Sequence, residues 1–157
     1  VRGITFTYGV ELSLACDVTI AADNCRFSQL EVLRGIMPTG GATIRFVQRA
    51  GWGNAMKYLL SGMEFNSEEA LKMNIVQEVV PADKVFTRAK EISENIASAA
   101  PLAVKETIKN AKIALEQGRE SAVSEFDSVQ KMLASSNDAK EGVESFKSKQ
   151  KPNFKGN

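Results

Sequence analysis

The chain changes character at Pro81, and this change limits the folds it can adopt more than any other feature of the sequence. Up to Pro81, short apolar runs that suit β-strands alternate with glycine- and proline-bounded segments that suit helices. We predict strands at 1–6, 18–22, 25–29 and 75–80, and helices at about 10–16, 42–51, 53–62 and 67–73. Repetition of short strand, loop and helix favours a layered α/β core over a helical bundle.

The helix predicted after residue 66 carries clear boundary signals. Asn66 and Glu69 have the spacing of a capping box, which predicts that the helix begins at Ser67. Asn74 suits the left-handed position that ends this helix, and Gly62 suits the same position after the preceding one. Local sequence therefore fixes the order of elements around residues 60–75.

Residues 82–157 predict only helices. Apolar side chains spaced by four, three and four residues form one face of a first helix, namely Val85, Ala89, Ile92 and Ile96. Pro101 suits a helix start, and Gly118 follows the predicted end of that second helix. We therefore divide the chain into an α/β part, residues 1–81, and a helical part, residues 82–157.

Two more helices are expected near the C-terminus. A third is predicted around residues 122–133 from its apolar spacing. A fourth begins at Asn137 or Asp138, either of which can cap it, with Val143 and Phe146 on its inner side.

Composition excludes several classes of site. The 157 residues carry 20 Lys and Arg against 19 Asp and Glu, a net charge of +1, so no global field favours nucleic acid or a membrane surface. With no histidine, Ser-His-Asp and Cys-His catalysis and histidine-ligated metals are excluded. Cys16 and Cys25 suit a reduced, cytoplasmic protein, as buried thiols rather than a disulfide. Acid–base chemistry then falls to carboxylates, Lys, Tyr or Cys.

Two acids stand among apolar neighbours, Glu11 in "TYGVELSLACD" and Glu31 in "RFSQLEVLRGI". Glu11 is equally well explained as a first-turn acid favoured by the helix dipole and as a functional carboxylate beside the backbone amides of a sharp turn. Glu31, taken alone, is better explained as a surface charge paired to Arg34 or Arg45. Both acids facing one cleft would supply a paired acid and base.

Other motifs point to function less clearly. The G-x-G of "RAGWGNAM" lacks the strand context of a dinucleotide site, and "PTGG" lacks the lysine of a phosphate-binding loop. Lysines at 147, 149, 151 and 155 follow Phe146. Such a tail is usually solvated, although aromatic and basic side chains together also suit an adenine ring and phosphates.

The ordered motifs in residues 9–46, "GVELSLACDVTIAADNCRFSQLEVLRGIMPTGGATIRF", resemble the signature region of the enoyl-CoA hydratase (crotonase) superfamily. The stretch "LLSGMEFNSEEALKMNIVQEVVP", residues 59–81, and the later "APLAVKETIK" and "KPNFK" are similar to further family motifs. The resemblance spans essentially the whole chain. It implies that an N-terminal portion of the family fold precedes Val1.

The resemblance implies a crotonase-like spiral of ββα turns, present in part. Residues 1–81 would form the C-terminal part of the spiral core and carry the active-site glutamates. Residues 82–157 would form a helical region that contacts coenzyme A and assembles the protein as a homotrimer or a dimer of trimers. The substrate would be an acyl-CoA thioester, with no separate cofactor and no nucleic-acid or membrane partner.

The resemblance also implies a hydro-lyase reaction. Water would add across the 2,3 double bond of a trans-2-enoyl-CoA to give a 3-hydroxyacyl-CoA, as in fatty-acid β-oxidation. Glu11 would hold and deprotonate the water and Glu31 would protonate C2, although a coupled pair can share both tasks. Alternatives are isomerisation or hydrolysis of another acyl-CoA, or a catalytically silent subunit that serves assembly.

Further site residues follow from the same resemblance. Tyr8 would give one backbone N–H to the oxyanion hole, the other donor lying outside this sequence. Substrate contacts would come from Gly9 and Thr39 near the carboxylates and from Phe146 and Lys149 near the nucleotide. The sequence departs from the family pattern where Thr7-Tyr8 replaces Gly-Gly, Leu30 replaces a common proline and Thr39 replaces glycine. These departures leave the acyl pocket, and with it the reaction, open.

Overall fold

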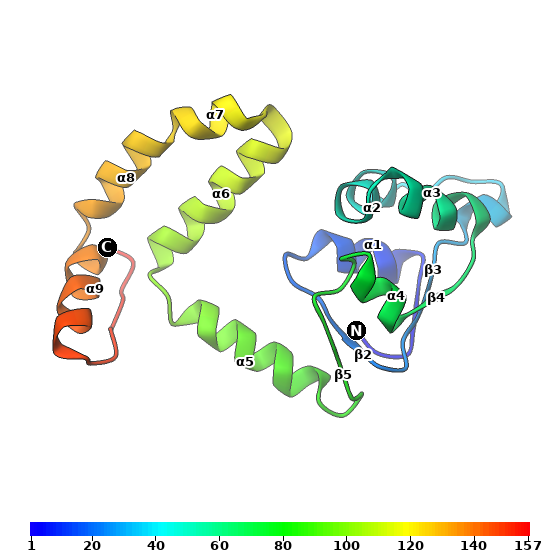
Figure 1. The fold of residues 1–157 in the computed structure, drawn as a ribbon, viewed down its shortest axis with the longest axis horizontal. Helices are drawn as coiled ribbons and strands as arrows, with labels where there is room; N and C mark the ends of the chain where they lie inside the picture. Colours follow the sequence, from blue (N-terminus) through cyan, green and yellow to red (C-terminus); the bar gives the residue numbers. More distant parts are fainter. The chain divides into compact units, whose positions relative to one another are not determined.

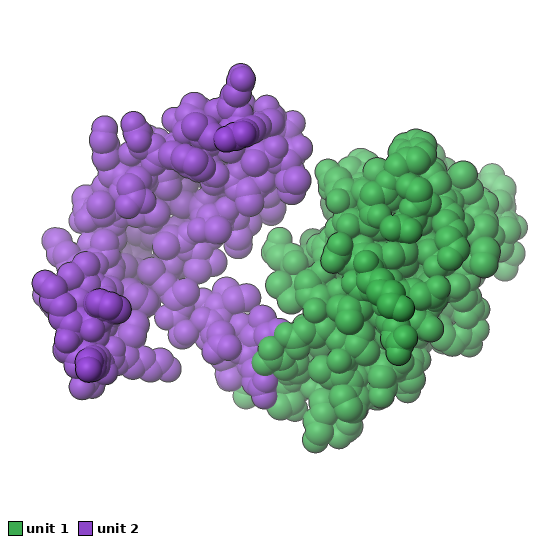
Figure 2. All heavy atoms as spheres, in the orientation of Figure 1, with its two compact units in different colours: residues 1–90 green, residues 91–157 purple.

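The computed structural model describes all residues 1–157, which divide into two compact units, Val1–Lys90 and Glu91–Asn157 (Figure 2). The first unit contains all the strands and mixes them with helices, whereas the second is helical. No helix is both long enough and apolar enough to cross a membrane.

The strands of the first unit form two small sheets (Figure 1). In one, β1 (Ile4–Phe6) pairs in parallel with β3 (Arg26–Ser28), which pairs antiparallel with β4 (Phe65–Asn66). In the other, β2 (Ile20–Ala22) pairs in parallel with β5 (Glu78–Val80). The predicted strands are therefore present but shorter than expected.

Side-chain hydrogen bonding explains why the β2–β5 pair is short. Just before β2, the Thr19 N–H donates to the side-chain oxygen of Gln77 at 2.8 Å, while the Gln77 N–H donates to the Thr19 carbonyl at 2.9 Å. The Gln77 side chain thus replaces a backbone acceptor, and the regular ladder begins only at Ile20. The alternation of apolar residues does not report such a replacement.

Five helical segments and the first turns of a sixth complete the first unit. They are α1 (Tyr8–Ala15), the 3₁₀ segment η1 (Glu31–Arg34), α2 (Ala42–Ala50), α3 (Trp52–Ser61), α4 (Ser67–Lys72) and α5 (Val85–Ala97). The expected boundary signals are confirmed. Asn66 and Glu69 form a reciprocal capping box, while Gly62 (φ 64°) and Asn74 (φ 60°) adopt the left-handed conformation.

An aromatic cluster fixes α2 and α3 against the three-stranded sheet. The Phe65 ring lies 5.3 Å from Phe27, 4.6 Å from Tyr58 and 5.8 Å from Phe46, measured between ring centroids. Each of these side chains is buried. Because offset and tilted aromatic pairs add to apolar burial, the cluster stabilises the position of α2 and of the loop before it.

The second unit contains α6 (Pro101–Gln117), α7 (Arg119–Ser124), α8 (Phe126–Ala134) and α9 (Asn137–Ser148), together with the end of α5. The expected single helix around 122–133 is wrong, because the chain breaks at Glu125. The Ala122 carbonyl accepts from the Asn110 side chain at 2.8 Å and from the Glu125 N–H at 3.3 Å. This tighter turn separates α7 from α8.

The cap of α9 also differs from expectation. Ser136, rather than Asn137 or Asp138, accepts from the Ala139 N–H at 3.0 Å. The carboxylate of Asp138 is buried and accepts instead from the N–H groups of Lys155 and Gly156, at 2.7 and 2.8 Å. The terminal segment, residues 150–157, is thereby held on α9.

Two further expectations about side chains are wrong. Val143 and Phe146 are not on an inner face, since they are 54% and 85% exposed. Cys16 is exposed, although Cys25 is buried as expected, and both cysteines are free thiols.

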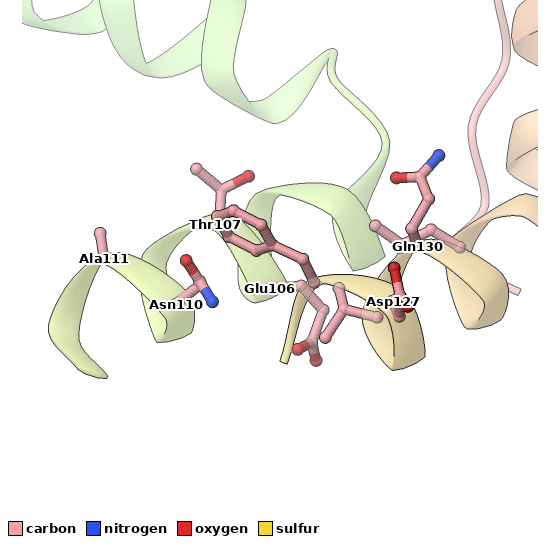
Figure 3. Close-up of a pocket in the computed structure, with 9 residues that line it drawn as sticks. Glu106, Thr107, Asn110, Ala111, Asp127 and Gln130 are labelled. Atoms are coloured by element: carbon pink, nitrogen blue, oxygen red, sulfur yellow. The ribbon is translucent and has the colours of Figure 1, made fainter. Parts of the chain in front are cut away.

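A hollow of about 570 Å³ lies between α6 and α8 of the second unit. Figure 3 shows Thr107, Asn110 and Ala111 on one wall and Asp127 and Gln130 on the other. None of the site residues expected from the sequence lines this hollow.

Candidate functional site

The start of α1 has an unusual backbone. Thr7, which precedes the helix, has φ 48° and ψ −107°, a combination that costs energy for a residue with a β-carbon. Its N–H donates to the Ser28 carbonyl at 2.8 Å, which joins α1 to the end of β3. Tyr8 then opens the helix, and its N–H has no partner within the chain. The turn therefore presents an unpaired amide at a helix N-terminus.

Glu11 lies one turn into α1 and is 5% exposed. One of its carboxylate oxygens accepts from the N–H of Ala42, the first residue of α2, at 3.2 Å. A β-carbon on Gly40 would collide with the same carboxylate. Glu11 is thus an acid in the first turn of α1, as one of the two interpretations expected. Its side chain is also buried against the start of α2. The absence of a side chain at residue 40 makes room for it.

Glu31 opens η1 and is half-buried. The side-chain amide of Gln29, in the orientation that satisfies its hydrogen bonding, donates to both Glu31 oxygens, at 3.2 and 3.0 Å, and to the Thr7 carbonyl at 3.3 Å. The expected ion pairs to arginine are absent, since Arg34 and Arg45 donate to backbone carbonyls. An amide, rather than an arginine, therefore orients Glu31.

The backbone of Glu11 and the amide that holds Glu31 share one hydrogen-bond acceptor. Thr7 O accepts from the Glu11 N–H at 3.1 Å and from the Gln29 amide that holds Glu31. Both acids therefore belong to the surroundings of the α1 N-terminus. Two carboxylates in such a setting can divide the roles of proton donor and proton acceptor between them.

The remaining residues expected near the carboxylates also fall in this region. Gly9 follows Tyr8 in α1 and approaches Thr5 of β1 closely, so that a β-carbon on it would lie 3.1 Å from the Thr5 methyl group. Thr39 precedes Gly40 and is exposed. Gly9 therefore has a packing role whether or not it contacts substrate.

The residues expected at the nucleotide lie in the second unit. Phe146 is on α9, and Lys149 ends that helix with φ 58°. Their contact with coenzyme A remains a prediction from the resemblance.

Gln29 and Gly40 were missed by sequence reasoning. Gln29 stands two residues before Glu31, close enough along the chain for its amide to reach that carboxylate. That spacing was the available signal for Gln29. Gly40 gave no signal, because the "PTGG" loop has no sequence feature that reports how closely Glu11 approaches it. No group of three or more Cys, Asp or Glu is arranged to hold a metal ion.

Comparison with known proteins identifies related sequences along the entire chain. The family model described as enoyl-CoA hydratase/isomerase matches residues 1–157. The 2,3-dehydroadipyl-CoA hydratase of Escherichia coli K12 is 34% identical over 160 residues, covering 99% of this chain and 61% of that protein. The carnitinyl-CoA dehydratase of Proteus mirabilis HI4320 is 33% identical, with the same two coverages of 99% and 61%.

A solved structure gives the same result for the fold. The crystal structure of a probable enoyl-CoA hydratase/isomerase from Mycobacterium abscessus superposes with a TM-score of 0.97 at 43% identity, covering 99% of this chain and 60% of that one. The chain spans about three fifths of the length of these relatives.

Proposed function

Because the chain belongs to the enoyl-CoA hydratase/isomerase family, we propose that it supplies the two catalytic carboxylates and one oxyanion donor of an enoyl-CoA hydratase. The reaction is the addition of water across the 2,3 double bond of a trans-2-enoyl-CoA, which gives a 3-hydroxyacyl-CoA. The observation that carries this proposal is that the Thr7 carbonyl, at the start of α1, accepts from the backbone N–H of Glu11 and from the Gln29 amide that holds Glu31. Relatives named as a CoA hydratase and a CoA dehydratase, which catalyse water addition or removal, support the reaction class.

Glu11 is assigned the role of holding and deprotonating the attacking water. The Ala42 N–H occupies one of its carboxylate oxygens and fixes the side chain, while the other oxygen can accept a hydrogen bond from a water molecule. As the water oxygen attacks C3, Glu11 takes one of its protons. The electrons of the double bond then move toward the thioester oxygen.

The backbone N–H of Tyr8 is assigned the role of stabilising the negative charge that develops on the thioester oxygen. Its N–H is unpaired and lies at the positive end of α1. One backbone donor at such a position typically stabilises the transition state by about 3–4 kcal/mol. The second donor would come from outside the sequence described.

Glu31, held by Gln29, is assigned to the proton that C2 receives. After the reaction Glu11 carries a proton that Glu31 has lost, and exchange between them or with solvent restores the starting state. Thr39, next to Gly40, would border the water, while Phe146 and Lys149 would contact the nucleotide of coenzyme A.

Substitution of each glutamate tests the proposal. In the full-length protein, Glu11→Gln and Glu31→Gln should each lower the rate of hydration of trans-2-butenoyl-CoA by about 100-fold or more, because a positioned acid or base contributes about that factor. Loss of absorbance of the conjugated thioester measures the rate. Glu68→Gln, at an exposed position on α4, is the matched control and should keep the wild-type rate.

Wild-type rates in both glutamine variants would contradict the assignment. Mass analysis of the product distinguishes the alternatives, since hydration adds one water to the intact thioester. Isomerisation leaves the mass unchanged, and thioester hydrolysis releases free coenzyme A. An inactive protein that binds no acyl-CoA would favour the assembly role.

We also propose that the complete protein assembles as a homotrimer or a dimer of trimers through the helical region. This assignment derives from the family alone. Light scattering coupled to size exclusion measures the molar mass, and a monomer would contradict it.

A further inference from the structure

Tyr8 combines a fixed backbone with a side chain that nothing covers. The residue is 78% exposed. The residue before it is held on two sides, because the Thr7 N–H donates to Ser28 at 2.8 Å and the Thr7 carbonyl accepts from Glu11 at 3.1 Å. A bulky aromatic group therefore projects from a well-anchored point at the start of the helix that carries Glu11.

Helix geometry determines the side from which the ring projects. In an α-helix the first N–H groups point out of the N-terminal end, and the Cα–Cβ bonds tilt toward the same end. Helical side chains also prefer rotamers that direct them toward the N-terminus. Because Tyr8 is the first residue of α1, its N–H and its ring leave the helix on the same side. A thioester oxygen that accepts from this N–H brings its carbonyl carbon beside the ring.

We propose that Tyr8 is a specificity-determining residue that disfavours acyl groups branched next to the thioester. This inference rests on the proposed function. A tyrosine side chain spans only a few bonds, so it reaches substituents on the first acyl carbons and not the far end of a long chain. A straight enoyl group is thin at C2 and passes the ring, whereas a methyl group on C2 meets it.

The test is a ratio of specificities in three forms of the full-length protein. The kcat/KM for trans-2-butenoyl-CoA and for its 2-methyl derivative is measured in the wild type, Tyr8→Ala and Tyr8→Phe. Alanine keeps the backbone donor and removes the ring, and phenylalanine keeps the ring. The ratio of branched to straight substrate should rise by roughly tenfold or more in Tyr8→Ala, the usual effect of one methyl group in a pocket, and stay near the wild-type value in Tyr8→Phe.

The same ratio of branched to straight kcat/KM in the wild type and in Tyr8→Ala would overturn the inference. Phe86→Ala removes a ring that is 74% exposed on α5 and should leave the ratio unchanged, which controls for the general loss of a surface aromatic group. Circular dichroism verifies that the variants keep the helical content of the wild type.

Binding measurements separate this inference from the proposed function. Butanoyl-CoA and 2-methylpropanoyl-CoA have no double bond and cannot be hydrated, so calorimetry gives their Kd values directly. If the wild type hydrates neither enoyl thioester, the proposed function fails. The ratio of the two Kd values then tests the role of Tyr8. If Tyr8→Ala binds the branched ligand more tightly relative to the straight one than the wild type does, the inference is supported. An unchanged ratio overturns it.

Discussion

Gln29 shows how much of this site depends on a residue that neither gains nor loses a proton. Its amide is 1% exposed and donates to both oxygens of Glu31 and to the Thr7 carbonyl. A carboxylate on a flexible side chain would otherwise sample several rotamers, and each rotamer would present its oxygens differently. The amide thus selects one orientation for the acid assigned to C2.

Replacing Gln29 with leucine should lower kcat by roughly tenfold, because leucine has no donor to orient Glu31 and each lost hydrogen bond contributes about 0.5–1.5 kcal/mol. Initial-rate kinetics measure kcat and KM, and we expect KM to change less than kcat. The control is Gln77→Leu, which removes a similar bridging amide between Thr19 and Asn74 away from the site. If Gln29→Leu keeps the wild-type kcat, the amide does not orient Glu31.

Among the elements, α9 binds the terminal segment 150–157 through two acidic side chains. Asp138 accepts from two successive backbone N–H groups, and the Glu141 carboxylate accepts from the Asn153 N–H at 2.8 Å. The ring of Phe154 also lies beside Gly142, where an added β-carbon would be 3.7 Å from it. The segment that contains "KPNFK" is thereby ordered on α9.

Asp138→Ala should destabilise the protein by about 3 kcal/mol, because it removes a charged acceptor and leaves two backbone donors without their partner. Urea unfolding monitored by circular dichroism measures the change. Glu144→Ala, at an exposed position on the same helix, controls for the loss of one acidic side chain and should have little effect. Equal unfolding midpoints for the two variants would show that the segment is held by other contacts.

The sequence predicts the ends of an element well when all the residues that interact there lie within one short stretch. The capping box of Asn66 and Glu69 and the left-handed ends at Gly62 and Asn74 are of this kind. The break at Glu125 was missed because its cause, the Asn110 amide, is distant along the chain. The cap of α9 differs for another reason: the partner of Ser136 is local, but Asp138, which was expected as a cap, bonds instead to residues near the C-terminus.

The same distinction between local and distant partners applies to the candidate site. Glu11, Glu31 and Tyr8 could be selected from sequence because they belong to ordered family motifs. The contacts of Glu11 with Gly40 and Ala42 could not, because they join α1 to a loop about thirty residues later, and only packing brings these segments together.

At the scale of the whole molecule, the two glutamates proposed to be catalytic lie in residues 1–90, and the residues predicted to contact the nucleotide lie in residues 91–157. Helix α5 runs through the boundary between the two units. Near its start, Arg88 donates to both oxygens of Glu78 on β5, at 2.7 and 2.8 Å. This bidentate hydrogen bond holds the pKa of Glu78 below its ordinary value.

The Glu78 pair makes stability depend on pH in a defined direction. Because the pKa is lowered in the folded state, the pair stabilises the protein above the unfolded pKa of the carboxyl, and this contribution is lost as the pH falls through the folded pKa. Glu78→Gln should therefore lower the Tm at neutral pH, and the difference from the wild type should close below about pH 4. Added salt should reduce it, because the pair is partly exposed.

Thermal scans across this pH range measure the difference, with Glu68→Gln as an exposed acid that forms no such pair. A difference that is the same at pH 7 and pH 3 would mean that glutamine disturbs packing and that the ion pair contributes nothing.

The Thr7 carbonyl accepts hydrogen bonds from both the backbone N–H of Glu11 and the side chain of Gln29. This shared acceptor has a consequence for protein engineering. A change that rotates this peptide group displaces both acids together, so neither can be moved independently from residue 7. Efforts to redirect the chemistry by relocating one carboxylate should therefore begin in the loop before Ala42, because Gly40 and the Ala42 N–H approach the Glu11 carboxylate directly. Libraries that randomise residues 38–41 would vary one partner of the pair and keep the other in place.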